Sequence, residues 1–130
     1  MIGFDLTEEQ RMIRDLARDF AQNEIAPQAA HHDETGEFPH AICKKAFELG
    51  LLNPGLPEKY GGAGMSCLME CVIAEELAAA EVRFGRVFEA GGKPQRALDI
   101  YNRVVLLVPD SPAATAALRG IQRIQLTAQG

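Results

Sequence analysis

The sequence predicts an all-α fold, and three observations indicate it. Apolar residues recur at helical spacing in several segments, as Ile13, Leu16 and Phe20 illustrate. Capping residues or prolines stand before these segments, and glycines follow their ends. No segment alternates between apolar and polar residues as a half-buried strand would; the β-prone run at residues 104–108 continues a helical pattern.

The first predicted helix begins after Thr7, which forms a capping box with Gln10. Its apolar stripe consists of Met12, Ile13, Leu16, Phe20 and Ile25. Pro27 should end or kink this helix, although residues 28–32 could continue it for a turn. After a loop, Pro39 introduces a second, short helix over residues 40–49, which Gly50 stops.

A long coil with two prolines and four glycines follows at residues 51–65. Ser66 is predicted to cap a long third helix over about residues 67–90, which Gly91 and Gly92 terminate. One face of that helix carries Ile73, Leu77, Phe84 and Phe88. Pro94 opens a fourth helix to residue 108, and Ser111 caps a fifth over residues 112–126. We therefore expect a five-helix bundle with a long central helix.

Composition indicates a soluble globular protein, because 47% of the 130 residues are apolar and 24% are charged. The chain has no apolar run long enough for a membrane span, and its first ten residues do not form a secretory signal, so we expect cytoplasmic expression. Residues 1–80 hold 14 acidic and 6 basic residues, and residues 81–130 hold 4 and 7. The acidic total without a basic cluster disfavours nucleic-acid binding.

The three cysteines, Cys43, Cys67 and Cys71, form no C-x-x-C pair, which argues against disulfides or a zinc site. We expect reduced, buried thiols, with Cys67 and Cys71 facing the bundle interior. His40 and Cys43 stand three residues apart, but nothing in the sequence orients the histidine or supplies an oxyanion hole. A core cysteine beside an exposed histidine is the favoured interpretation.

Three further stretches could suggest a binding or catalytic site. The stretch "YGGAG" at residues 60–64 lacks the preceding strand and the Gly-Lys-Ser/Thr ending of a phosphate loop, so a structural turn is favoured. Four consecutive metal-binding residue types occupy positions 31–34, but they point in different directions. Glu75 and Glu76 diverge on a helix and make a poor acid–base pair. We predict no catalytic, cofactor-binding or metal site, and no cofactor.

Residues 3–79 resemble the start of the acyl-CoA dehydrogenase family. The phrases "FDLTEEQRMIRDLARDFAQNEIAP", "ELGLLNPGLPEKYGGAGM" and "CLMECVIAEELAAA" carry the resemblance, and the second is the most specific because its Gly and Pro positions fix an unusual loop. The resemblance implies an α-helical first domain. The family continues into a β-domain that holds much of the flavin and a helical domain with the catalytic glutamate, and neither has a counterpart here.

Residues 81–124 resemble a tetratricopeptide repeat with a following capping helix. The signature W-x2-L-G-x2-Y…A-x3-F…P is matched by Phe84, Gly85, Phe88, Ala97, Tyr101 and Pro109. Glu81 departs from it, since the repeat prefers Trp there. Small residues such as Gly85 and Ala97 let paired helices approach closely, and large ones such as Tyr101 fill the space between them.

The two resemblances meet inside residues 75–92, which suggests a division into residues 1–80 and 81–130 within one continuous structural unit. Our leading hypothesis is a designed, chimeric helical scaffold without catalytic activity, assembled from fragments of two natural helical proteins. The alternatives are a tetratricopeptide-type interaction module and a remnant of a flavin-dependent acyl-CoA dehydrogenase. No partner is required by any of these features, and weak peptide binding or self-association is left open.

Overall fold

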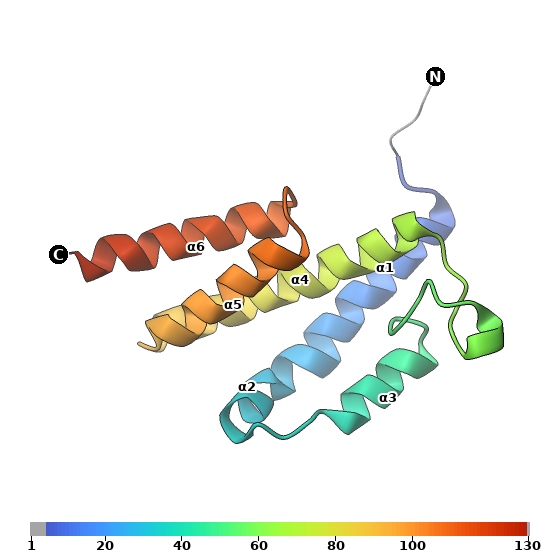
Figure 1. Ribbon diagram of the computed structural model, residues 1–130, viewed down its shortest axis with the longest axis horizontal. Coiled ribbons are helices and arrows are strands. Elements are labelled where there is room, and N and C mark those ends of the chain that lie inside the picture. The colour runs from blue at the N-terminus through green and yellow to red at the C-terminus, as the bar shows by residue number, and fades with distance from the viewer. Residues whose placement is uncertain (1–4, 130) are drawn as a thin grey trace. The chain divides into compact units, whose positions relative to one another are not determined.

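A computed structural model describes residues 5–129, and its helices fall into two compact units (Figure 1). The N-terminal unit ends at Glu76, and the C-terminal unit begins at Leu77. Residues 5–129 contain helices and turns but no strand, which confirms the all-α prediction. The parts of our predictions that fall on residues 1–4, including the start of the first resemblance, lie outside the described residues.

From residue 5 to Glu76, the N-terminal unit contains three α-helices and the beginning of a fourth. They are α1 (Glu8–Phe20), α2 (Ala26–Thr35), α3 (His40–Glu48) and the first part of α4 (Cys67–Ala90). A π-helical turn, η1 (Ala21–Ile25), joins α1 to α2, and a short 3₁₀ turn, η2 (Glu58–Tyr60), lies in the loop before α4. Figure 1 shows α2 continuing the line of α1 and α3 returning in the opposite direction.

The helix at the N-terminus continues past Pro27 to Thr35, further than we predicted. Proline cannot donate the i→i−4 hydrogen bond, and its ring collides with the carbonyl of residue i−4 in a regular helix. The turn directly before Pro27 is π-helical, so that the Ala26 N–H bonds to the Ala21 carbonyl, five residues back. The wider turn accommodates the proline, and the helix continues through it.

Side-chain caps are present at three of the predicted helix N-termini. The Thr7 hydroxyl accepts the Gln10 N–H at 3.2 Å, while the Gln10 side chain accepts the Thr7 N–H at 3.0 Å. Ser66 caps α4 through the Met69 N–H at 3.4 Å. Ser111 caps the last helix through the Ala114 N–H at 3.0 Å. These caps confirm three of the predicted helix starts.

The buried apolar residues of the N-terminal unit come from α1, η1, the loop and α4. They are Ala17, Phe20, Ala21, Leu51, Val72 and Ile73. Phe20 confirms part of the predicted apolar stripe, but Met12 is 67% exposed. Leu51 is the first residue of the long loop, so the loop is anchored in the core where it begins.

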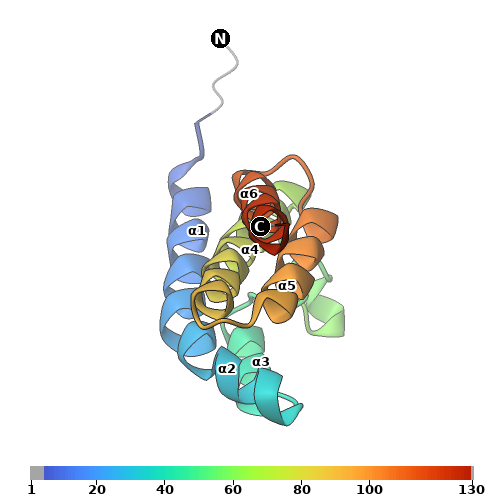
Figure 2. The ribbon, with the colours of Figure 1, turned by 90° about the vertical axis from the view of Figure 1, so that its left-hand side faces the viewer.

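The C-terminal unit consists of the rest of α4 together with α5 (Pro94–Leu107) and α6 (Pro112–Ala128). Figure 2 views α6 nearly end on and shows α5 next to it. α4, α5 and α6 all contribute to the core of this unit, which contains Ala78, Val82, Phe88, Ala97, Ile100, Tyr101, Val104, Ala113, Ala117 and Ile124. Phe84 packs against this core. Phe84 and Phe88, which we placed on one face of this helix, therefore both contribute to the core of the C-terminal unit.

Tyr101 is the largest fully buried side chain of this core. A β-carbon added to Gly85 of α4 would lie 2.5 Å from its ring, and one added to Gly120 of α6 would lie 2.4 Å from it. Both glycines are thus required by close packing, because real β-carbons essentially never approach this closely. In the part of the chain that the structure describes, no helix has the length and hydropathy needed to cross a membrane.

Candidate functional sites

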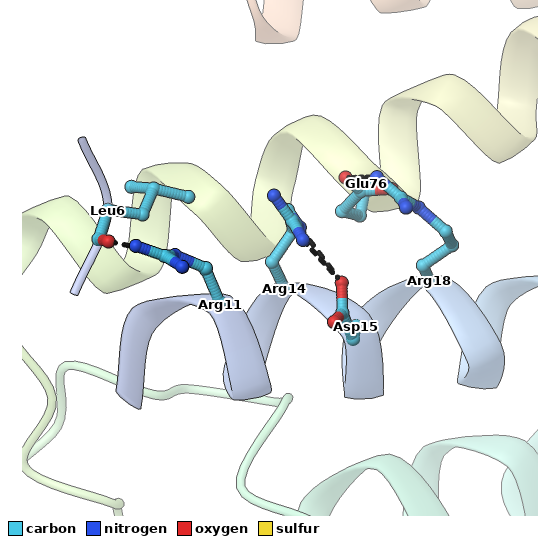
Figure 3. A network of polar contacts seen from close by, with 6 residues as sticks. All are labelled: Leu6, Arg11, Arg14, Asp15, Arg18 and Glu76. Carbon is cyan, nitrogen blue, oxygen red and sulfur yellow. Dashed lines mark hydrogen bonds and ion pairs between the residues drawn. The ribbon is translucent and has the colours of Figure 1, made fainter. Parts of the chain in front are cut away.

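An ion pair joins α1 to α4 within the N-terminal unit. Arg18 donates from Nε to one carboxylate oxygen of Glu76 at 3.0 Å and from Nη2 to the other at 2.8 Å. Figure 3 shows this pair beside Arg14, which is bonded to Asp15, and Arg11, which is bonded to the Leu6 carbonyl. Because Glu76 is fully engaged by Arg18, it is not poised to act as a base.

A hollow of about 300 Å³ lies next to this pair, between the start of the chain's described part, α1 and α4. Leu6, Leu68 and Val72 form its apolar wall, and Arg14, Cys71, Glu75 and Glu76 bring its polar groups. Loss of hydration raises the pKa of the Cys71 thiol, and the neighbouring Cys67 raises it further. The thiol is therefore protonated at neutral pH and a weak nucleophile.

The cysteines of α4 correct one of our predictions. Cys67 and Cys71 are exposed and Cys43 is half-buried, whereas we expected buried thiols with the α4 pair facing inward. At 100° per residue, Val72 and Ile73, which are buried, point to the side of the helix opposite Cys67 and Cys71. Two cysteines spaced at i and i+4 were therefore not enough to identify the buried face of the helix.

The loop of residues 51–66 is held by its own hydrogen bonds and by one carboxylate of α4. The Gly55 N–H donates to Glu70 Oε1 at 2.9 Å. Within the stretch read as a turn, the amides of Gly61, Gly62 and Gly64 donate to carbonyls of residues 56–58. These amides are consumed inside the loop, so they do not form the row of outward-pointing donors that a phosphate loop requires.

The histidines lie on the surface of the N-terminal unit. His31 and His32 contact the side chain and the carbonyl of Glu37, respectively. His40 is exposed and packs its ring against Phe38, with the ring centroids 4.7 Å apart. Among residues 5–129, no three His, Cys, Asp or Glu side chains are grouped closely enough to hold a metal ion.

A second hollow, of about 610 Å³, lies in the C-terminal unit between the end of α4 and α6. Its polar groups are Arg86, Glu89 and Arg123, and Ala90 and Ile124 form part of its wall. Arg123 donates from Nε and Nη2 to the two oxygens of Glu89, each at 2.9 Å. The Tyr101 hydroxyl donates to Glu89 at 2.8 Å from the other side.

This three-residue network shifts the pKa values of its members. The hydrogen bond from Arg123 holds the pKa of Glu89 below its usual range, against the effect of burial. Burial first, and then the bond to Glu89, raises the pKa of Tyr101 to about 12. Sequence reasoning missed this network, because Glu89 and Arg123 are 34 residues apart and ordinary surface residues by pattern.

The comparison with known proteins identifies a family. The profile described as "Acyl-CoA dehydrogenase, N-terminal domain" matches residues 7–93. A probable acyl-CoA dehydrogenase of Bacillus subtilis, YngJ, is 47% identical over 79 residues, which are 61% of this chain and 21% of that protein. A probable medium-chain specific acyl-CoA dehydrogenase of Caenorhabditis briggsae is 47% identical over 76 residues, 58% of this chain and 19% of that protein.

A third relative, the 3-(aryl)acrylate reductase of Clostridium sporogenes, is 45% identical over 74 residues, 57% of this chain and 20% of that protein. The chain thus spans about a fifth of the length of the curated relatives it matches. The profile match also includes residues 81–93, which we assigned to a separate segment beginning at Glu81.

These natural relatives overturn our leading hypothesis. The matched relatives are dehydrogenases of bacteria and a nematode, and the family profile matches residues 7–93, past the point near residue 80 where that hypothesis placed the join. The hypothesis of a designed scaffold is therefore wrong, and the family signal supports the dehydrogenase alternative instead. With residues 7–93 matching its N-terminal domain, the chain belongs to the acyl-CoA dehydrogenase family.

Proposed function

We propose that the chain contributes the N-terminal helical part of an acyl-CoA dehydrogenase and has no dehydrogenase activity by itself. The observation that carries this proposal is the family match over residues 7–93, which includes the capped α1 and the loop before α4. The relatives' names indicate acyl-CoA thioesters as the substrate class.

The absence of activity in the isolated chain is inferred from its carboxylates. A catalytic base must reach a substrate proton and have a pKa suited to accepting it. Glu76 is engaged by Arg18, Glu70 by the Gly55 amide, and Glu89 by Arg123 and Tyr101. We infer that the catalytic base is supplied by the portion of the relatives that this chain does not match.

The flavin that the family uses does not fit the N-terminal hollow. At about 300 Å³ the hollow is at the small end of ligand pockets. Its rim carries Glu75, whose negative charge would repel a pyrophosphate, while Arg14 is bonded to Asp15 and Glu76 is paired with Arg18. We infer that most contacts to a flavin also come from the rest of such an enzyme.

A hybrid enzyme tests this proposal. The aligned segment of the Bacillus subtilis relative is replaced by the matching residues of this chain, and flavin absorbance and oxidation of octanoyl-CoA with an artificial electron acceptor are measured. We expect the hybrid to bind flavin and retain activity, while the present chain alone shows neither. A folded hybrid without flavin would contradict the proposal.

The loop supplies a matched pair of variants for this hybrid. A β-carbon at Gly55 would lie 2.1 Å from Glu70 Oε1, so Gly55→Val should displace the loop and lower activity. Ala41→Val adds the same side chain at an exposed position of α3 and should leave activity unchanged. Equal activity of the two variants would show that the loop conformation does not matter to the enzyme.

We further propose that residues 81–124 adopt the packing of a single tetratricopeptide-like repeat and its cap. The supporting observation is the burial of Tyr101 between Gly85 and Gly120, with Ala97 fully buried in the same core. Repeats of this kind stabilise one another by stacking. Joining a consensus repeat after residue 124 should therefore raise the melting temperature, whereas an unrelated helical hairpin of equal length should not.

A further inference from the structure

The hollow between α4 and α6 combines fixed cationic groups with an apolar wall. Glu89 holds Nε and Nη2 of Arg123, so the Nη1 amino group of that arginine is not used in the pair. Arg86 also lines the hollow, and its charge contributes to the lowered pKa of Glu89. With two arginines and one carboxylate, the hollow has an excess of positive charge.

Positive charge also predominates in the unit that contains this hollow. Residues 77–130 contain seven basic and four acidic residues within a chain whose net charge is −5. The uncapped N-terminus of α5, which begins at Pro94 on the rim, adds a partial positive charge. An anionic group is therefore the complementary ligand.

The exposure of the rim indicates what kind of molecule carries that anion. Arg86, Ala90, Gly92, Pro94 and Thr127 are exposed, and only Ile124 at the base is buried. Small-molecule sites usually enclose most of their ligand's surface. An open hollow with an apolar base instead suits a short stretch of extended peptide, which can lay one side chain on Ile124 while its neighbours remain in solvent.

We propose that this hollow binds an extended acidic peptide of a protein partner. An Asp or Glu side chain of the peptide pairs with Arg86 and with the Nη1 group of Arg123, and an adjacent apolar side chain packs on Ile124. The Tyr101 hydroxyl bond to Glu89 fixes the orientation of Arg123 before the peptide arrives. This proposal concerns the C-terminal unit and does not depend on dehydrogenase activity.

The test uses the full chain and a fluorescein-labelled peptide, Ser-Gly-Leu-Asp-Leu-Glu-Gly-Ser, amidated at its C-terminus so that only side-chain carboxylates are present. We expect saturable binding by fluorescence anisotropy that weakens as salt concentration increases. The analogue with Asn and Gln in place of Asp and Glu should bind at least about tenfold more weakly. Equal binding of both peptides, or no saturable binding, would overturn the proposal.

The matched variants are Arg86→Gln and Arg119→Gln. Both remove one positive charge from an exposed position, but only Arg86 lines the hollow. We expect a loss of about tenfold or more for Arg86→Gln and little change for Arg119→Gln. Circular dichroism melting verifies that each variant is folded, and Arg86→Lys, which keeps the charge but not the fork of donors, should be intermediate.

Two other occupants would appear as distinct results that refute the proposal. A single-stranded oligonucleotide that displaces the peptide at lower concentration would indicate a nucleic-acid site. A doubling of mass in analytical ultracentrifugation that Arg86→Gln abolishes would indicate that the acidic N-terminal half of a second copy occupies the hollow. Equal losses in the Arg86 and Arg119 variants would indicate a general charge effect and no specific site.

Discussion

At the scale of single residues, the position of Tyr101 depends on two missing β-carbons. Gly85 and Gly120 leave space on either side of its ring, and Glu89 accepts its hydroxyl proton in a hydrogen bond. The resemblance to the tetratricopeptide signature marked Gly85 as a close-packing position. Sequence reasoning did not recognise Gly120, because a lone glycine inside a helix carries no sign of what approaches it.

We expect Gly120→Ala to destabilise the C-terminal unit. Alanine is the better helix former by about 1 kcal/mol. However, its β-carbon would lie 2.4 Å from the Tyr101 ring, and overpacking of this kind typically costs about 1–3 kcal/mol. Chemical denaturation should show a net decrease in the free energy of unfolding. The double variant with Tyr101→Leu should recover part of it, because leucine has no ring at that position. An increase in stability for Gly120→Ala alone would show that the ring moves freely.

The Tyr101 hydroxyl gives the stability a dependence on alkaline pH. Its pKa is raised to about 12 in the folded protein, compared with about 10 for an unfolded tyrosine. The protonated phenol therefore stabilises the fold fully below about pH 10, and this contribution is lost as pH increases toward about 12. Denaturation at several alkaline pH values should show a steeper loss for the natural chain than for Tyr101→Phe. Parallel curves would contradict the assignment.

At the scale of elements, helix starts were easier to predict than helix continuity. Thr7, Ser66 and Ser111 mark helix starts by local chemistry, which a sequence states directly. Pro27 was expected to stop or kink a helix, but the π-helical turn at residues 21–25 lets α1 pass into α2. A turn that rearranges to accommodate a proline involves several residues at once, so a single-residue signal does not reveal it.

We expect Pro27→Ala to convert the π-helical turn at residues 21–25 into regular α-helix. The new N–H at residue 27 could donate to the Asn23 carbonyl, four residues earlier, and the ring collision would be gone. Nuclear magnetic resonance would detect this as slower amide exchange at residue 27 than at neighbouring exposed positions and α-helical carbon shifts through residues 21–27. A π turn that persists in the variant would mean that tertiary packing, and not the proline, determines it.

Two features of the candidate sites could not be predicted from the sequence. They are the ion-pair network at the C-terminal hollow and the outward-facing cysteines. Glu89 and Arg123 meet only because α4 and α6 pack in one particular register. Cys67 and Cys71 are exposed because Val72 and Ile73 take the buried side of α4. Both facts depend on the rotation of a helix about its axis, which spacing alone fixes poorly when a helix is apolar on several sides.

At the scale of the whole molecule, α4 belongs to both units. Val72 and Ile73 are buried in the N-terminal unit, and Ala78, Val82 and Phe88 are core residues of the C-terminal unit. The helix class and the family were predicted from the sequence, because both rest on local patterns and a distinctive loop. The division of the chain into residues 1–80 and 81–130 stays a prediction, and the family match continues past it to residue 93.

We expect the chain to unfold in one cooperative transition, because a helix shared by both cores couples their melting. Ala80→Pro should separate the transition into two, since an interior proline disrupts the helix by about 3 kcal/mol or more. Ala80→Gly, which costs only about 1 kcal/mol, should leave a single transition at a lower temperature. Differential scanning calorimetry distinguishes these outcomes. Two resolved transitions in the unmodified chain would show that the units melt independently.

The enclosure of Tyr101 also provides an optical reporter of the C-terminal unit. The chain has no tryptophan and only two tyrosines, and the other, Tyr60, is 66% exposed on the loop of the N-terminal unit. A ring fixed in an asymmetric environment produces near-ultraviolet circular dichroism, whereas a mobile exposed ring contributes little. The tyrosine band of the unlabelled protein therefore reports the packing of α4, α5 and α6, and it can be followed without attaching any dye.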